Sequence, residues 1–343
     1  MKKLPILTLL CVAALSAGLY GLRMHWGLDF LASKVRANDA QADAVSVEES
    51  PEKTEKQPET AIAVATQAEA TQPETEQKPS ALPFIQALRK RLMNPTSPYS
   101  VKMLQFARVN DRREVIRSQY SQSGMLKSRL SVEMSFLGIH ARLLQVSDGE
   151  RLWTERQMVP RKQENPTETP VSVKPWLEVR RRQLSSLKRI VEENQLSLES
   201  PEVCQMICGG VPAMMASMER MFQWTQSGNT SINQRPATVF EGTWEASSLL
   251  SLEPKSPHQL MMFEHFRPDV VELSVDHQTG LPVRIVYYER NKEQKPARSP
   301  VFAIEFQEWQ FGQLEESETF QYRIPNGVVP VDETHECMVH LKP

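Results

Sequence analysis

One stretch of the sequence, residues 204–222, combines residue types that could do chemistry, because it is rich in cysteine and methionine sulfur. Thiols and thioethers bind soft metal ions such as copper(I), and two thiols can form a disulfide. Neither a nearby histidine nor a regular methionine spacing supports a copper site, so we predict no metal here. The apolar residues of the stretch instead recur at helical spacing, at Met214, Met218, Met221 and Phe222.

This stripe of methionines has two interpretations. As the apolar side of a helix, it packs into a hydrophobic core and needs no ligand. Alternatively, it belongs to a lid helix that lines a cavity, where flexible and polarizable methionine side chains adapt to varied apolar ligands. We therefore take the four residues of the stripe, together with Trp244 from a later alternating pattern, as candidate cavity and lid residues.

The cysteines outside the N-terminal segment are disulfide candidates. They are Cys204, Cys208 and Cys337. In an oxidising compartment, Cys337 could join the C-terminal tail to either of the other two, and every pairing leaves one thiol over. A bond between Cys204 and Cys208 is awkward inside one helical turn. The remaining alternative is three free, buried thiols.

Motifs for other kinds of chemistry are absent from the sequence. It contains no glycine-rich phosphate loop, no Gly-x-Ser-x-Gly, no His-Glu-x-x-His and no Cys-x-x-Cys. We therefore expect a non-enzymatic protein without a cofactor or catalytic residues. The run Arg180, Arg181 and Arg182 either contacts acidic headgroups or a partner, or is a solvated helix face.

Charge is distributed unevenly along the 343 residues, which hold 40 Lys and Arg against 42 Asp and Glu. Residues 1–36 carry five basic residues and one acidic residue, whereas residues 37–81 carry ten acidic and three basic residues. The rest of the chain, residues 82–343, is therefore close to neutral. This argues against nucleic-acid binding, which needs a basic excess to neutralise phosphates.

The first segment is predicted to be an export signal. Lys2 and Lys3 precede an uncharged apolar stretch, residues 4–22, that is just long enough to cross a bilayer. We interpret residues 1–36 either as an uncleaved membrane anchor with its flank or as a cleaved signal peptide.

The second segment, residues 37–81, is predicted to be a disordered acidic linker. It is rich in Ala, Glu, Gln, Thr and Pro and has no aromatic residue. Such a composition cannot bury enough apolar surface to offset the entropy of ordering, and its charge keeps it extended. We expect it to hold the following domain away from a membrane.

Residues 82–343 are predicted to form one α+β domain. A helix over 83–93 precedes segments of alternating polar and apolar residues, such as 130–136, that are typical of strands with one wet face. A proline-rich loop and a helix over 176–194 are interpreted as an insertion at 159–200. A further helix begins after Ser200.

The last third of this domain returns to strand patterns. A turn is predicted at 276–282, and strands are predicted around it and over 320–324. The apolar phase slips by one residue between Phe306 and Trp309, which indicates a β-bulge. Strands before and after a group of helices indicate a strongly curved antiparallel sheet with helices covering one face.

Two short stretches carry a family resemblance. Residues 272–288 contain a strand, an Asp-x-x-Thr-Gly-Leu-Pro hairpin and the next strand, and residues 320–334 contain an aromatic strand, a Pro-x-Gly turn and an acidic end. With the order of elements over 83–336, they resemble the LolA/LolB-like superfamily of periplasmic lipoprotein carriers. The resemblance implies an unclosed β-barrel with helices over the concave face and an apolar cavity. The insertion and the linker depart from the basic carrier.

The resemblance also implies a function and a location. We expect an exported envelope protein that binds a lipid, lipoprotein acyl chains or another hydrophobic ligand in a lidded cavity. It is anchored through residues 4–22 at the periplasmic side of the inner membrane, or it is secreted to the periplasm. The alternative is a non-enzymatic sensor or scaffold module of the envelope, whose concavity binds a protein segment or is filled by side chains.

Overall fold

The computed structural model describes residues 79–109, 112–136, 139–160, 174–245, 268–290, 298–312 and 314–341. The predicted export signal at 1–36 and the predicted linker, apart from its last three residues, lie outside this part of the chain. Among the described residues, no helix has both the length and the apolar character needed to cross a membrane.

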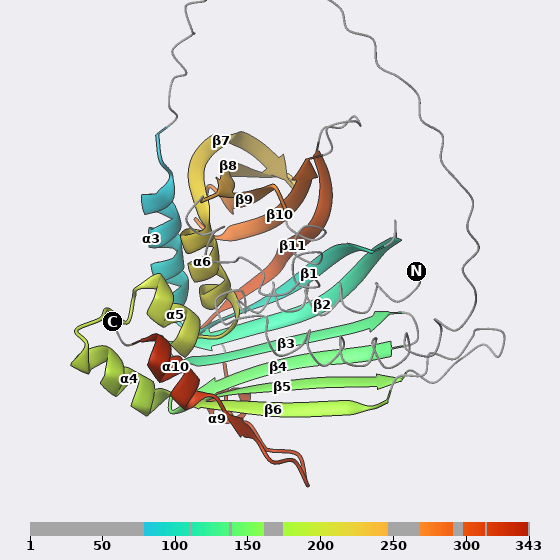
Figure 1. Ribbon diagram of the computed structural model, residues 1–343. Helices are drawn as coiled ribbons and strands as arrows, with labels where there is room; N and C mark the ends of the chain where they lie inside the picture. The colour runs from blue at the N-terminus through green and yellow to red at the C-terminus, as the bar shows by residue number, and fades with distance from the viewer. Residues whose placement is uncertain are drawn as a thin grey trace, which may run out of the picture.

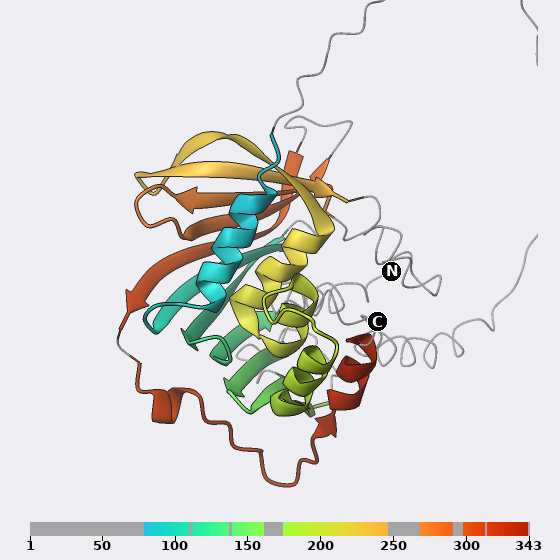
Figure 2. The ribbon, with the colours of Figure 1, turned by 90° about the vertical axis from the view of Figure 1, so that its left-hand side faces the viewer.

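Twelve strands form one sheet, and helices gather on one of its faces (Figures 1 and 2). The strands are β1 (Tyr99–Val109), β2 (Arg112–Ser123), β3 (Lys127–Phe136), β4 (Ile139–Asp148), β5 (Arg151–Pro160), β6 (Trp176–Gln183), β7 (Phe222–Ile232), β8 (Arg235–Trp244), β9 (Val270–Asp276), β10 (Pro282–Arg290), β11 (Arg298–Phe311) and β12 (Val331–Asp332). The described helices are α3 (Leu82–Met93), α4 (Leu184–Glu193), α5 (Pro201–Ile207), α6 (Gly210–Met221), α9 (Glu316–Thr319) and α10 (Thr334–His340).

The sheet is strongly curved and does not close. Its strand order is β12-β6-β5-β4-β3-β2-β1-β11-β10-β9-β8-β7, so β11 pairs with β1 and joins the two halves of the chain. All named pairs are antiparallel except the short pair of β12 with β6, which is parallel. The predicted α+β fold with an unclosed sheet is confirmed, with one parallel pair that the sequence did not indicate.

Two hydrophobic clusters hold the helices to the sheet. The larger one lies between α3, α6 and the concave face, and it includes Ile85, Leu88 and Met215 together with strand residues such as Tyr120. The smaller one joins α4, α5 and α10 and contains Leu187 among its buried residues. Figure 2 shows α3 and α6 side by side in front of the strands, with α5 and α4 following α6 down the same face.

Local signals predicted several turns correctly. The hairpin after β9 is closed by Asp276, whose Oδ1 accepts hydrogen bonds from the backbone N–H groups of Gln278 (2.9 Å) and Thr279 (2.7 Å). The β-bulge is confirmed, because Met103 and Val101 of β1 face Phe306 and Trp309, with a register shift between them. Such a bulge adds local bend to a sheet that must curve around helices.

One predicted helix is wrong in its first half. Residues 176–183 form strand β6, which pairs with β5, and only Leu184–Glu193 is helical. The insertion predicted at 159–200 thus contributes a strand to the main sheet. Residues 161–173, within the predicted loop, lie outside the described part. The helical periodicity of residues 176–183 was misleading, because pairing with the edge of β5 stabilises a strand by more than the weak local preference for a helix.

The C-terminal strap, residues 314–333, replaces the strand predicted at 320–324. It leaves β11 and runs to the edge strand β6, after which α10 packs into the smaller cluster (Figure 2). On its way, Tyr322 stacks on Trp153 with ring centroids 5.3 Å apart and donates a hydrogen bond of 2.8 Å to Glu155. The aromatic residues of this stretch therefore bind the sheet through side chains rather than through backbone pairing.

The three consecutive arginines fasten the strap to β6. Arg181 contacts Asp332 at 2.8 Å, while Arg180 and Arg182 contact the two carboxylate oxygens of Glu333 at 2.6 and 3.1 Å. The arginines are thus neither a solvated helix face nor free for headgroups. Their ion pairs cover the edge of β6, which would otherwise be open to pairing with another chain.

Gly210 at the start of α6 allows a close contact that no other residue permits. Its φ is +60°, and a Cβ there would lie 2.1 Å from the ring of Tyr120. Gly124 also has a positive φ, +66°, but nothing lies within 4 Å of its Cβ position. We expect Gly210→Ala to destabilise the fold by about 1–3 kcal/mol more than Gly124→Ala, because overpacking adds to the common backbone strain. Urea unfolding of both variants measures the difference, and equal losses would contradict it.

The stability that the strap gives to the fold should depend on pH. Burial alone would raise the pKa of Glu333, but Arg182 and Arg180 hold that pKa below its ordinary value. A glutamate whose pKa is lowered by folding stabilises the folded state at pH values above its ordinary pKa of about 4.3. This stabilisation is lost as the pH falls through the lower pKa of the folded state. We expect Glu333→Gln to be less stable than wild type at pH 7 and to lose less stability on acidification. Exposed Glu336→Gln is the control in thermal unfolding between about pH 7 and pH 3.

Candidate functional site

Helix α6 provides one wall of the candidate site. It follows the Gly209-Gly210 break and continues into β7 without a loop, because Phe222 is both its C-cap residue and the first residue of the strand. The indole N–H of Trp224 donates a hydrogen bond of 3.1 Å to the carbonyl oxygen of Met218 and fixes this junction. The helix is therefore held at both ends, by the glycine contact and by the strand.

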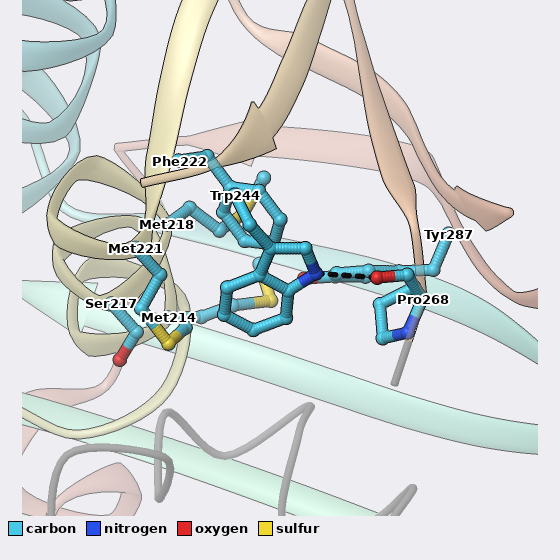
Figure 3. Close-up of a pocket in the computed structure, with 8 residues that line it drawn as sticks. All are labelled: Met214, Ser217, Met218, Met221, Phe222, Trp244, Pro268 and Tyr287. Atoms are coloured by element: carbon cyan, nitrogen blue, oxygen red, sulfur yellow. Dashed lines mark hydrogen bonds between the residues drawn. The ribbon is translucent and has the colours of Figure 1, made fainter. Parts of the chain in front are cut away.

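A small apolar pocket lies between α6 and strands β8 to β10 (Figure 3). Its lining residues are Met214, Ser217, Met218, Met221, Phe222, Trp244, Pro268 and Tyr287. Two polar side chains of this lining form hydrogen bonds: the indole N–H of Trp244 donates to the carbonyl of Pro268, and the hydroxyl of Ser217 accepts from Gln205 and donates to the carbonyl of Ala213. The enclosed space is about 10 Å³, which accommodates about one water molecule.

All five candidate cavity residues from the sequence line this pocket. Met214, Met218 and Phe222 are buried, with at most 3% of their surface exposed, while Met221 and Trp244 are partly exposed at the rim. Phe222 and Trp244 contact each other with ring centroids 4.6 Å apart. The geometry brings the residues together, and their role in binding stays a prediction.

Three lining residues were missed by the sequence interpretation. Tyr287 belongs to an alternating strand pattern that was recognised, and its face could have been assigned to the concave side. Burial raises the pKa of its phenol well above the ordinary value, so the hydroxyl stays neutral. Ser217 shares the α6 face with the methionines, whereas nothing in the local sequence indicated Pro268.

The apolar surface continues on the concave face beyond the helices. Figure 1 shows that strands β2 to β6 run on past α3, α5 and α6. On the concave face, β2 to β5 carry buried apolar residues: Ile116, Val132, Met134, Ala141 and Leu143 belong to the larger cluster, and Met158 is buried as well. The pocket therefore adjoins the larger cluster, whose covered apolar side chains continue across the concave face of these strands.

A buried ion pair ties α6 to α3. The Nε of Arg89 donates to Glu219 at 2.6 Å, and the two side chains are only 2% and 5% exposed. Burial opposes the charge of Arg89, but the hydrogen bond and the charge of Glu219 prevail, so the pKa of Arg89 lies above its ordinary value. One of its terminal nitrogens, Nη1, has no hydrogen-bond partner in the described structure.

The three cysteines are free and buried, so none of the candidate disulfides is present in the structure. All three belong to the smaller cluster, where α10 brings Cys337 to the helices that carry Cys204 and Cys208. Helix α10 thus lies beside the helices of this cluster without a disulfide to them. A hydrogen bond with Cys208, together with the charge of Arg89, holds the pKa of Cys204 below its ordinary value. The same hydrogen bond raises the pKa of Cys208, and burial adds to that increase.

The fold defines a class: an unclosed, curved β-sheet with helices on its concave face and an apolar pocket beside the central helix. No family model and no curated protein matches the sequence. Solved structures do. An uncharacterised conserved protein from Thermus thermophilus matches with a TM-score of 0.37 and 10% identity, over 74% of this chain and 98% of its own.

Two further solved structures also match the chain. A LolA superfamily protein from Nitrosomonas europaea matches with a TM-score of 0.25 and 12% identity, over 71% of this chain and 98% of its own. A chain of the MucA/MucB complex from Pseudomonas aeruginosa matches with a TM-score of 0.33 and 12% identity, over 71% of this chain and 61% of its own. LolA superfamily proteins are thus among the structures that the chain resembles, as the sequence predicts.

The buried ion pair allows a double-mutant test. We expect Arg89→Met to destabilise the protein by about 3–5 kcal/mol, because it leaves the Glu219 carboxylate buried without a partner. In Arg89→Met/Glu219→Leu no charge remains buried, so most of the stability should return. Denaturant unfolding of the wild type, both single variants and the double variant measures the coupling. Additive losses would show that the pair does not act as a unit.

Proposed function

We propose that the protein is a non-enzymatic binding protein of the cell envelope that holds a lipid or another hydrophobic ligand against the concave face of its sheet. The observation that carries this proposal is the convergence of Met214, Met218 and Met221 with Phe222 and Trp244 on one apolar pocket. The buried apolar residues of β2 to β5 on the concave face support it, because they would contact a chain that extends from the pocket once the groups that cover them move aside.

The pocket must open to admit a ligand, since about 10 Å³ holds a single water molecule. Its wall is suited to this. Methionine side chains have three rotatable bonds and no branch, so they can move aside and repack against varied shapes at small cost. Each methylene group of a chain that becomes buried contributes about 0.8 kcal/mol, which can offset the rearrangement after a few carbons.

The proposed location follows from the sequence. The export signal that the sequence predicts would place the domain in the periplasm, and an uncleaved segment at 4–22 would anchor it to the inner membrane. The acidic linker would then allow the domain to reach ligands some distance from the bilayer.

A second candidate function is an interaction module whose concavity is filled by its own side chains. The small size of the pocket and the extensive cluster beneath α3 and α6 favour it. In this case the fold is a rigid scaffold, and the partner is a protein segment, as the name of the MucA/MucB complex indicates for that protein.

Apolar-probe binding separates the two functions. We expect N-phenyl-1-naphthylamine to bind the wild-type chain with increased fluorescence, and Met221→Gln to weaken binding about tenfold or more. The reason is that an amide buried in an apolar pocket without a partner costs about 1–3 kcal/mol. Met221 is partly exposed, so the variant should fold.

The matched control is Met338→Gln on α10, which is also partly exposed but lies in the smaller cluster. It should bind the probe like the wild type. A wild-type chain that binds no probe, and yields no acyl species by native mass spectrometry after purification without detergent, would favour the interaction module. Equal effects of the two substitutions would show that the probe binds elsewhere.

A further inference from the structure

Among the residues that the structure describes, Arg156 on the concave face has only a long ionic contact. Arg156 lies in the middle of β5, paired in register with Leu143 of β4 and Glu178 of β6. Side chains directly opposite each other on neighbouring strands share a face of the sheet. Because Leu143 belongs to the cluster beneath α6, Arg156 points to the same concave side.

The carboxylates near Arg156 are already engaged by other arginines. Glu178 contacts Arg180 at 2.6 Å, and Glu333 contacts Arg180 at 2.6 Å and Arg182 at 3.1 Å. The second oxygen of Glu178 lies 3.9 Å from Nη1 of Arg156, which is beyond hydrogen-bond length. In the described part of the chain, Arg156 therefore makes one long ionic contact and no hydrogen bond.

This group of five residues carries an excess positive charge. Among the described residues, three guanidinium groups meet two carboxylates here. Burial, together with the charge of Arg180, lowers the pKa of Arg156 below its ordinary value. Burying a guanidinium group without a hydrogen-bond acceptor costs free energy, and a bound ligand that supplies an acceptor would remove this cost. The side chain is 23% exposed, so an acceptor from solution can reach it.

Apolar residues continue from Arg156 along the same face. Two residues further along β5 is Met158, and the inward residues next to it on β4 and β3 are Ala141 and Met134. All three are buried. A ligand with a charged head at Arg156 would therefore have an apolar chain contact these residues after displacing the groups that cover them.

We propose that Arg156 binds an oxyanion, a carboxylate or a phosphate, that forms the head of an anionic amphiphile. The planar guanidinium fork matches either group with two parallel hydrogen bonds, and the excess charge beside it requires an anion rather than a neutral head. The chain part of this proposal rests on the proposed function, whereas the oxyanion part rests on Arg156 and its neighbours alone.

The test compares ligands that differ only in the head group. Laurate, dodecyl phosphate and 1-dodecanol are titrated into the full chain by calorimetry, below the concentrations at which they aggregate. Wild type should bind the two anions at least about tenfold more tightly than the alcohol, because a charge-assisted bidentate pair is worth more than one factor of ten. Arg156→Gln should abolish that preference while leaving dodecanol affinity unchanged.

Controls separate this role from a structural one. Arg151→Gln, an exposed arginine at the start of the same strand, should keep the preference. Arg156→Lys keeps the charge but loses the fork, so an intermediate preference is expected. Because Arg156→Gln also removes repulsion with Arg180 and Arg182, its ligand-free melting temperature should equal or exceed that of wild type. A retained anion preference in Arg156→Gln, or no preference in wild type, overturns the proposal.

A failure of the proposed function gives a different result. If no twelve-carbon ligand binds to wild type, inorganic phosphate and acetate are titrated alone at constant ionic strength. Saturable binding of these anions that is lost in Arg156→Gln supports an oxyanion site that binds free anions. In that case the proposed binding of an apolar chain is wrong. No anion binding to wild type overturns both proposals.

Discussion

The buried ion pair between Arg89 and Glu219 determines the position of helix α6. Two charged side chains that are almost fully desolvated tolerate little displacement, because a lost contact leaves an uncompensated charge in an apolar environment. The pair fixes α3 against α6 across the cluster on the concave face. The position of α6 in turn sets the direction of its methionine side chains, and these form the wall of the pocket. The adaptable part of the site is thus carried by a helix whose backbone is held firmly.

A second constraint is the unequal distribution of charge over the curved sheet. At the β6 edge, three arginines secure the C-terminal strap through Asp332 and Glu333, which closes an edge that a half-open barrel would leave unpaired. The same arrangement engages Glu178 and Glu333, so that Arg156 has a single long ionic contact within the part of the chain that the structure describes. Stability at the edge and a positive charge on the concave floor therefore have a common origin, and both lie beside an apolar surface.

Local chemistry made part of this structure predictable. Asp276 and Gly280 define a hairpin, Ser200 caps α5 through the N–H of Val203 at 3.3 Å, and the phase slip in β11 marks the bulge. Helical spacing likewise placed the methionines of α6 on one face. Interactions between distant positions were not predictable: the arginine run of β6 has its partners about 150 residues further on, and Arg89 meets Glu219 across 130 residues. Without those partners, the arginines suggested an exposed helix. Tyr322 suggested a strand, although it binds the sheet through its ring.

The central claim is that an apolar chain binds between α6 and the concave face, against the methionine wall. The most direct measurement is a set of nuclear Overhauser effects between bound 1-dodecanol and the methionine methyl groups of the ¹³C-methyl-labelled full chain. The account predicts contacts from the alkyl chain to Met214, Met218 and Met221, and none to Met206 and Met338 of the smaller cluster. Contacts confined to the smaller cluster, or a ligand that binds without touching the α6 methionines, would contradict it.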